Sequence, residues 1–160
     1  MEATAFQDLF TGNFCFGCGP TNQDGLQIKS YWAGPGKSVC TFKPKPYHTA
    51  GPRQFLNGGI IATLIDCHCV STAIAQAYQD EGRPFDSATP IWYVTGSLTI
   101  KYLRPTPIDR PVQLTAHIVE TGPKKTVLSC SLSSSGQECA TGEVIAIRVP
   151  WSWRDEETAG

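Results

Sequence analysis

The chain has 160 residues, of which 41% are hydrophobic and 17% are charged, and its formal net charge is −1. This length and composition fit one globular domain with its own hydrophobic core and exclude a disordered or fibrous chain. The near-neutral charge provides no basic face for nucleic acid, and no apolar run approaches the ~20 residues of a membrane span, so we expect neither partner.

The first quarter of the chain is predicted to be a turn-rich segment followed by a β-hairpin. Residues 1–25 are polar and rich in turn residues, and we expect them to pack on the main domain. Apolar and polar residues alternate over 26–33, which predicts a strand, and the Gly34-Pro35-Gly36 turn leads to a partner strand over 38–42.

A long apolar helix is predicted over residues 57–79, between a proline-rich stretch and the breakers Gly82 and Pro84. Asp66 is the one acid within an almost uncharged run. An unsatisfied buried polar group costs about 1–3 kcal/mol, so this carboxylate needs a partner or a function. It lies more than two turns into the helix, too far to act as a cap.

After the helix the apolar period changes from about 3.6 to 2, which predicts strands. Strands are expected over 97–102, 112–118, 126–132 and 139–149, with Trp151–Trp153 finishing the last one and 154–160 forming a loose tail. One helix with strands before and after it predicts an α+β domain over residues 26–153. We expect an antiparallel sheet of about five or six strands wrapped around one long central helix.

Three motifs carry a family resemblance over roughly residues 13–150. They are Asn57-Gly58-Gly59 followed by Asp66, the segment from Cys15-Phe16-Gly17-Cys18-Gly19 to Leu26, and Tyr102-Leu103-Arg104-Pro105. Together they resemble the hotdog-fold acyl-CoA thioesterases, in particular the PaaI-type branch. The resemblance implies a homodimer or dimer of dimers that hydrolyses an acyl-CoA to a free acid and coenzyme A without a metal or other cofactor. It also implies Gly58 as the oxyanion donor and Asp66 as the nucleophile or general base.

The chemistry of these residue types agrees with that resemblance. A helix N-terminus offers free N–H groups and the positive end of a dipole, which suits a developing oxyanion, and glycine lets a carbonyl approach. A carboxylate in a partly dry pocket can activate water or attack a thioester carbon. Gly58 and Asp66 are eight residues apart, or ~12 Å along one helix, so both can act on one carbonyl only from different subunits.

Further site residues are assigned around this pair by resemblance. Asn57 is expected to cap the helix or to bind a substrate oxygen, and Gly59 to lie against the substrate. Relatives carry a polar residue about six positions before the helix start. That position is Gly51 here, so Gln54 is assigned instead, with Arg53 as the second choice. Thr95, with Ser97 as the alternative, matches a hydroxyl early in the next strand. The coenzyme A phosphates could be held by any of Lys101, Arg104, Lys124 and Lys125, and an acyl pocket could be lined by Trp92 and Tyr93.

Seven cysteines, in a chain without a recognisable signal pattern, are interpreted mostly as buried small apolar groups, and we expect a cytoplasmic location. Cys15 and Cys18 have the spacing of a redox pair or of half a metal site. A zinc site needs about four ligands, and nothing in the sequence brings His48 near, so structural packing is favoured and no metal is expected. His68 lies two residues after Asp66, on another helix face, and is predicted to be a packing or interface residue.

Two other functions stay open at this point. Acyl-thioester hydratases and dehydratases share the fold but generally pair His with an acid, and Asn57 speaks against that pattern. A non-catalytic acyl-CoA or ligand-binding module is the third hypothesis, because Gly51 occupies the position where a polar residue is expected.

Overall fold

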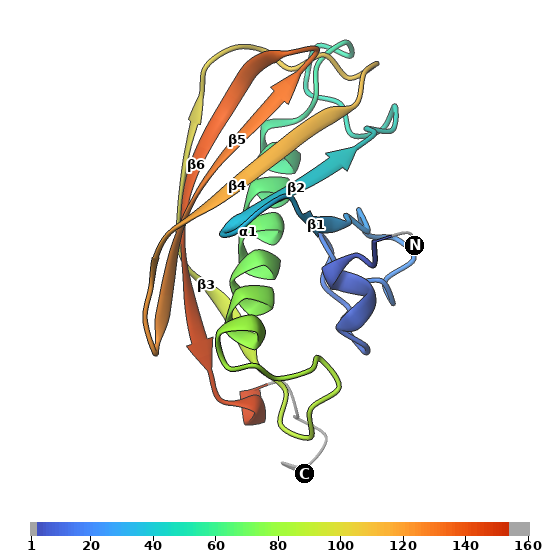
Figure 1. The fold of residues 1–160 in the computed structure, drawn as a ribbon. Helices are drawn as coiled ribbons and strands as arrows, with labels where there is room; N and C mark the ends of the chain where they lie inside the picture. Colours follow the sequence, from blue (N-terminus) through green and yellow to red (C-terminus); the bar gives the residue numbers. More distant parts are fainter. Residues whose placement is uncertain (1–2, 154–160) are drawn as a thin grey trace.

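One long helix, α1 (Gly58–Asp80), lies along the inner face of a six-stranded antiparallel sheet in the computed structural model, which describes residues 3–153 (Figure 1). The strand order across the sheet is β1-β2-β4-β5-β6-β3. The predicted α+β arrangement is therefore confirmed, while the expected tail over 154–160 lies outside the described residues. The strands are β1 (Ser30–Trp32), β2 (Lys37–Phe42), β3 (Trp92–Tyr102), β4 (Val112–Thr121), β5 (Lys125–Ser134) and β6 (Gln137–Val149).

The first strand is shorter than the alternation over 26–33 predicted. Gln27 has a φ of 51°, in the left-handed region, which interrupts an extended backbone. The residues on either side bond back to the N-terminal loop instead, with Leu26 N donating to Phe16 O at 2.7 Å and Ile28 N to Gly17 O at 3.2 Å. The N-terminal segment is thereby tied to the start of the hairpin.

Helix α1 begins where the sequence predicted. The Asn57 side-chain oxygen accepts hydrogen bonds from Gly59 N at 2.8 Å and Ile60 N at 3.2 Å, which is an N-cap. By length and hydropathy alone this helix could cross a membrane, which the sequence analysis did not expect, but most of it is buried inside the protein. The sheet covers one side, and the short 3-10 helix η1 (Phe6–Leu9) packs against another, so its apolar character is that of a core helix.

Strand β3 begins at Trp92, five residues earlier than the alternation had predicted. A β-bulge between Thr95 and Ser97 shifts its register against β6 and breaks the period of two. Gly96 occupies the bulge, where an added Cβ would lie 2.5 Å from Ile147 Cγ1. At the other end, Trp151–Trp153 forms the 3-10 helix η2 instead of finishing β6, which ends at Val149 before Pro150.

A polar cluster lies within the core between α1 and the β1–β2 hairpin. His68 is fully buried, and its Nδ1 and Nε2 contact the hydroxyls of Ser30 at 2.8 Å and Ser38 at 3.2 Å. Burial lowers the pKa of His68 to about 4, so the ring is neutral at pH 7. The prediction that His68 is a packing residue is confirmed.

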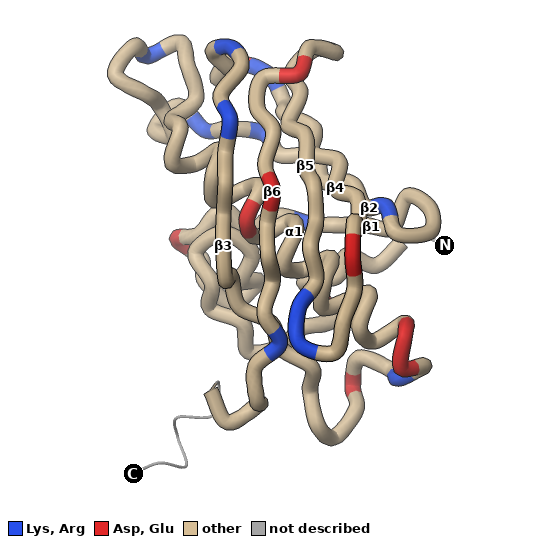
Figure 2. The backbone as a smooth tube through the Cα atoms, turned by 90° about the vertical axis from the view of Figure 1, so that its left-hand side faces the viewer, with Lys and Arg blue, Asp and Glu red and all other residues tan. Residues whose placement is uncertain are grey.

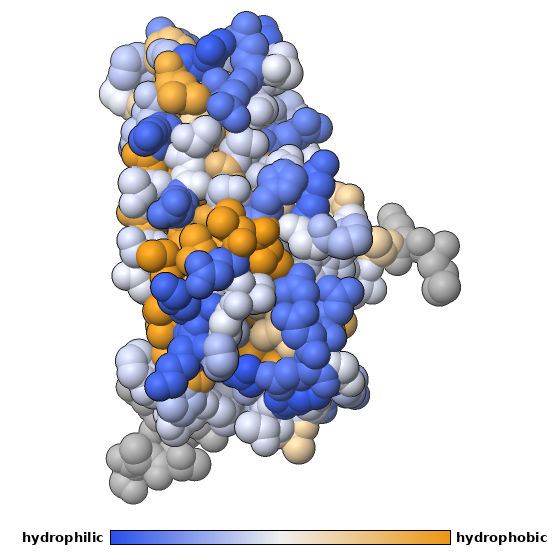
Figure 3. Space-filling view, turned by 60° about the vertical axis from the view of Figure 1, so that its left-hand side comes forward, coloured by the Kyte–Doolittle hydropathy of each residue, from blue (hydrophilic) through white to orange (hydrophobic). Residues whose placement is uncertain are grey.

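The outer face of the sheet carries few charged residues (Figure 2). Val127, Ile145 and Ile147 are half-buried on strands whose inward residues are fully covered. Hydrophobic side chains gather in patches on this side of the molecule (Figure 3). Asp66 lies on the other face of the sheet, against which helix α1 packs.

We predict that His68 makes folding stability depend on pH. Because its pKa falls from 6.5 when unfolded to about 4 when folded, its neutral form contributes stability above pH 6.5 that is lost as pH falls towards 4. The loss should reach about 3 kcal/mol. Chemical unfolding of wild type and His68→Gln from pH 4 to 7.5 measures it, with the ring titration followed by NMR. Parallel stability curves for the two proteins would contradict the assignment.

Candidate active site

Asp66 lies on the side of α1 that faces the bulge of β3. Its Oδ1 accepts a hydrogen bond of 2.6 Å from the hydroxyl of Thr95, a residue that the resemblance had assigned to the substrate-binding part of the site. Burial raises the pKa of Asp66, the Thr95 hydrogen bond opposes that rise, and negative charge on Cys15 adds to it. The carboxylate is half-buried, and no bond to its second oxygen is found among residues 3–153.

Ser97, the predicted alternative to Thr95, does not join this cluster within one chain. Ile100 packs beside the helix residue Ile65, and Tyr102 bonds to the helix start, so the even-numbered residues after the bulge face α1. Ser97 therefore belongs to the opposite face of the strand. The bulge explains why both hydroxyls cannot point to Asp66.

A cavity of about 240 Å³ opens beside Asp66. Asp66, Val70 and Ile74 follow one another at intervals of four along the helix and form one wall, while Thr95 stands opposite. The predicted acyl-pocket residues Trp92 and Tyr93 both line it. The carboxylate thus sits in an otherwise mainly apolar chamber.

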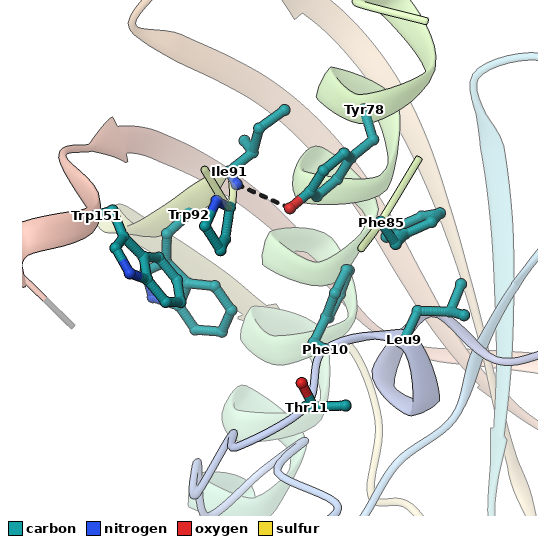
Figure 4. A pocket seen from close by; sticks show the side chains of 9 residues that line it. Leu9, Phe10, Thr11, Tyr78, Phe85, Ile91, Trp92 and Trp151 are labelled. Atoms are coloured by element: carbon teal, nitrogen blue, oxygen red, sulfur yellow. Dashed lines mark hydrogen bonds between the residues drawn. The ribbon is translucent and has the colours of Figure 1, made fainter. Parts of the chain in front are cut away.

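An aromatic pocket of about 130 Å³ lies next to this cavity, towards the end of α1 (Figure 4). The two spaces share Phe10 and Trp92 as lining residues. In Figure 4, Trp92 and Trp151 stand on one side, with Phe10, Phe85 and Tyr78 on the other. The Tyr78 hydroxyl accepts a hydrogen bond of 2.8 Å from Ile91 N. The residues that line this pocket add apolar surface but no carboxylate and no histidine.

The start of α1 forms a second, separate part of the candidate site. Asn57 uses its side-chain oxygen for Gly59 N and Ile60 N, and its carbonyl for Ile61 N at 3.1 Å. Gly58 N–H alone among these amides has no acceptor within residues 3–153. Asn57 therefore acts as a helix cap, and the amide that the sequence assigned to the oxyanion is left available.

A groove of about 440 Å³ runs past Gly58. Arg104 and Tyr102 line it, and the Tyr102 hydroxyl donates to Gly58 O at 2.6 Å. Lys and Arg gather at this end of the molecule, where β3 ends (Figure 2). Lys125 pairs with Ile147 whereas Lys101 pairs with Thr141, so Lys124 and Lys125 lie at the opposite end of β6.

Gln54 is not brought to Asp66. It is exposed, its backbone oxygen accepts from Ile108 N at 3.0 Å, and it lines neither the Asp66 cavity nor the Gly58 groove. Gly59 is exposed, with its amide engaged by the cap. Of the predicted supporting residues, Thr95 contacts Asp66 and Arg104 lines the Gly58 groove.

Three cysteines meet next to Asp66, an arrangement that sequence reasoning missed. Cys15 and Cys18 of the N-terminal loop meet Cys67 of α1, with all three sulfurs within 4.8 Å of one another. Hydrogen bonds from the other two thiols lower the pKa of Cys15, while its charge and hydrogen bond raise the pKa of Cys18 to about 11. The Cys-x-x-Cys spacing was the available signal, but the third thiol is 52 residues away from Cys15.

The family model of the thioesterase superfamily matches residues 54–141, more than half of the chain, and the chain belongs to this superfamily. It is 31% identical to human acyl-coenzyme A thioesterase 13 over 114 residues, covering 71% of this chain and 70% of the relative. It is 28% identical to acyl-coenzyme A thioesterase THEM4 of Xenopus laevis over 142 residues, 87% of this chain, and spans about half (54%) of that relative's length.

Solved structures confirm the hotdog fold. A thioesterase superfamily protein from Shewanella loihica superposes with a TM-score of 0.63 at 37% identity, covering 77% of this chain and 91% of that one. The E. coli PaaI protein has a TM-score of 0.63 at 20% identity, with coverages of 78% and 80%. The predicted membership of the thioesterase superfamily is therefore confirmed, and the PaaI protein shares the fold of this chain.

We predict that Thr95→Val raises the pKa of Asp66. The Thr95 hydroxyl stabilises the charged carboxylate, and burial remains when the hydroxyl is removed. NMR titration of the Asp66 carboxyl carbon measures the change, with Thr99→Val, an exposed residue of the same strand, as the matched control. An unchanged or lower pKa in Thr95→Val would rule out this contact as a determinant of Asp66.

Proposed function

We propose that this protein hydrolyses an acyl-CoA thioester to a free acid and coenzyme A, at a site shared between two copies of the chain. The observation that carries the proposal is Asp66, a half-buried carboxylate held through one oxygen by Thr95 at the mouth of a mainly apolar cavity. A purely structural acid would be expected to have its remaining acceptor capacity satisfied by neighbouring groups. The second oxygen of Asp66 is available for chemistry.

The Gly58 amide supplies the second element of the proposed reaction. Attack on a thioester places negative charge on the carbonyl oxygen, and a preorganised N–H at a helix start stabilises that charge. Asn57 satisfies the next amides of the turn but not that of Gly58. Tyr102 holds the Gly58 carbonyl and so fixes the orientation of the peptide groups at the helix start.

Assembly of two copies follows from the length of the helix. Eight residues separate Gly58 from Asp66, which is ~12 Å along α1 and too far for both to reach one carbonyl. Strand β3 lies at the edge of the sheet with residues 95–99 exposed, and such an exposed edge is open to strand pairing. A second copy docked along β3 would place its own helix start near Asp66.

The ends of the site match the two ends of an acyl-CoA. The groove at Gly58 contains Arg104 and opens at the end of the molecule where basic residues gather, which suits the phosphates of coenzyme A. The mainly apolar cavity at Asp66, with the aromatic pocket beside it, suits an acyl group. The two relatives are both named acyl-coenzyme A thioesterases, which supports the same substrate class.

The proposed reaction begins with attack on the thioester carbon while Gly58 N–H binds the carbonyl oxygen. Either the Asp66 carboxylate accepts a proton from the attacking water, or it attacks directly and water then hydrolyses the anhydride. The C–S bond breaks, and the coenzyme A thiolate leaves and takes up a proton. A single turnover in ¹⁸O-labelled water distinguishes the routes, because only the anhydride route can place label in Asp66.

The hydratase alternative is disfavoured by His68. Both nitrogens of this ring are engaged by buried serines, so it cannot form the His–acid pair with Asp66. His48 lies before the helix start, with its ring Nδ1 accepting from Lys45 N at 3.0 Å. A non-catalytic binding module is distinguished by assay.

We predict that Asp66→Asn lowers kcat for coenzyme A release by about 10²–10⁴-fold, the usual range for loss of a general base, and leaves KM within a few-fold. The assay measures release over a panel of aromatic, short and long acyl-CoAs. Asp80→Asn, an exposed acid at the far end of the same helix, is the matched control and should retain wild-type rates. Equal, near-background release by wild type and Asp66→Asn on every thioester would favour the binding module.

A mixed dimer tests the shared site. Gly58→Pro removes one N–H at the first helical position, where proline is well tolerated, and Gly58→Ala is the control because its Cβ would meet Tyr102 at 3.5 Å, an ordinary contact. We predict that dimers of Gly58→Pro with Asp66→Ala, purified through two different tags, recover about half of the wild-type kcat per dimer, since one of two symmetric sites is intact. No recovery would place both residues of each site in one chain.

A further inference from the structure

The three-cysteine cluster is assembled from two segments that are far apart in the sequence. Cys15 and Cys18 lie in the N-terminal loop, and Cys67 lies on α1 directly after Asp66. The sulfurs of Cys15 and Cys67 are 3.6 Å apart, and all three lie within 4.8 Å of one another. Cys18 and Cys67 are buried, whereas Cys15 is exposed, so the cluster has one open side.

The loop is shaped to bring these sulfurs together. An added Cβ at Gly17 would lie 2.2 Å from the Cys67 sulfur, and one at Gly19 would lie 2.4 Å from Cys15 N. Both glycines therefore allow approaches that a side chain would prevent. Gly19 N also donates to Cys15 O at 2.8 Å, which closes the turn between the two cysteines.

Asn13 forms hydrogen bonds with two of the three cysteines. It is buried, its Oδ1 accepts from Cys15 N at 3.0 Å, and its Nδ2 donates to the Cys18 sulfur at 3.6 Å. The backbone N–H groups of Gly17 and Cys18 also stabilise negative charge on the Cys15 sulfur. Such donors around sulfur are the outer contacts that orient thiolate ligands of a metal.

The spacing of the sulfurs fits a metal better than a disulfide. Zn–S bonds of about 2.3 Å place the sulfurs of a tetrahedral site about 3.8 Å apart. A disulfide needs about 2.0 Å and uses only two of the three thiols. The observed 3.6 Å between the sulfurs of Cys15 and Cys67 lies close to the tetrahedral edge, and the sulfur of Cys18 lies within 4.8 Å of both.

We propose that Cys15, Cys18 and Cys67 bind one Zn²⁺ ion through three thiolates, with the fourth position left to water or another exchangeable ligand from the Asp66 cavity. All three cysteines and Asp66 line that cavity, which gives the open position an access route. Soft thiolate ligands select Zn²⁺ among the abundant divalent cations. The ion would fasten the N-terminal loop to α1 next to the candidate catalytic acid.

No metal was expected from the sequence, because only Cys15 and Cys18 have the spacing of metal ligands. The fold supplies the third, at a position that looked like an ordinary buried cysteine. Zinc binding is independent of the proposed thioester chemistry, and its test measures the metal rather than turnover.

The experiment uses the full chain. Zinc is measured in the purified, desalted protein, and Zn²⁺ and Co²⁺ are then titrated into chelator-treated, reduced protein. Zinc affinity is read by competition with a chromophoric chelator, and cobalt–thiolate absorbance reports sulfur ligands. The variants are Cys15→Ser and Cys67→Ser, with Cys139→Ser as the matched control, because its buried thiol bonds to Gln137 O outside the cluster. Cys15 is exposed, so its variant should fold, which circular dichroism of the metal-free proteins checks.

We expect one zinc per wild-type chain and a cobalt–thiolate absorbance. Both should be lost in Cys15→Ser and Cys67→Ser and kept in Cys139→Ser. Asn13→Ala should weaken zinc binding by about 10–100-fold, as loss of an outer contact does. Wild-type protein that binds no zinc while its three thiols react freely would overturn the proposal. So would a mass lower by two hydrogens, which indicates a disulfide, or zinc that persists in both cluster variants.

Discussion

The hydrogen bond between Thr95 and Asp66 joins the central helix to the edge strand at the place where that strand bulges. Helix α1 is apolar on nearly every side, so hydrophobic burial alone gives it no single stripe that would fix its rotation about its own axis. The few polar side chains provide that orientation. Asp66 contacts β3, His68 contacts the β1–β2 hairpin, and Cys67 contacts the N-terminal loop. Three consecutive residues of α1 thus contact three different segments of the chain.

These three residues also show how a structural polar group differs from a functional one. Both ring nitrogens of His68 are occupied, and the residue is fully buried, so the ring has no remaining capacity for a substrate. Asp66 has one oxygen held and the other available in a cavity. Cys67 joins two further sulfurs in an arrangement that ordinary packing of small apolar groups does not require. Unused bonding capacity next to a cavity, rather than polarity in a core helix, therefore marks the candidate site.

Much of this arrangement could be predicted from local patterns. The helix and its Asn57 cap were predicted because the cap, the glycine pair and the apolar run are adjacent in the sequence. The first half of β3 was missed because the Thr95–Gly96 bulge interrupts the alternation on which strand prediction depends. The shortening of β1 follows from the left-handed conformation of Gln27, which has no strong local signal in a residue of that type.

The site was predictable only where its contacts were encoded in the resemblance. Thr95 could be assigned to the site, although its bond to Asp66 could not, and Arg104 falls at the groove. The assignment of Gln54 depended on a loop shape that the chain does not adopt. Cys67 could not be linked to Cys15 and Cys18, because the contact depends on how the glycine-containing N-terminal loop folds back onto α1. Such long-range contacts arise from the packed fold and leave no periodic trace in the sequence.

Basic residues and apolar cavities lie at different places along α1, which is a further reason to treat the proposed site as shared. The basic end and the groove lie at the helix start, while the apolar cavity and the aromatic pocket lie beyond Asp66. One chain thus has a basic surface at one end and an apolar chamber further along, with the proposed oxyanion donor and the acid ~12 Å apart. A two-fold axis between antiparallel helices would remove that separation, because in the proposed isologous interface Gly58 of each copy would meet Asp66 of the other. The same operation pairs each groove with the opposite chamber, so one symmetric contact would complete two sites at once.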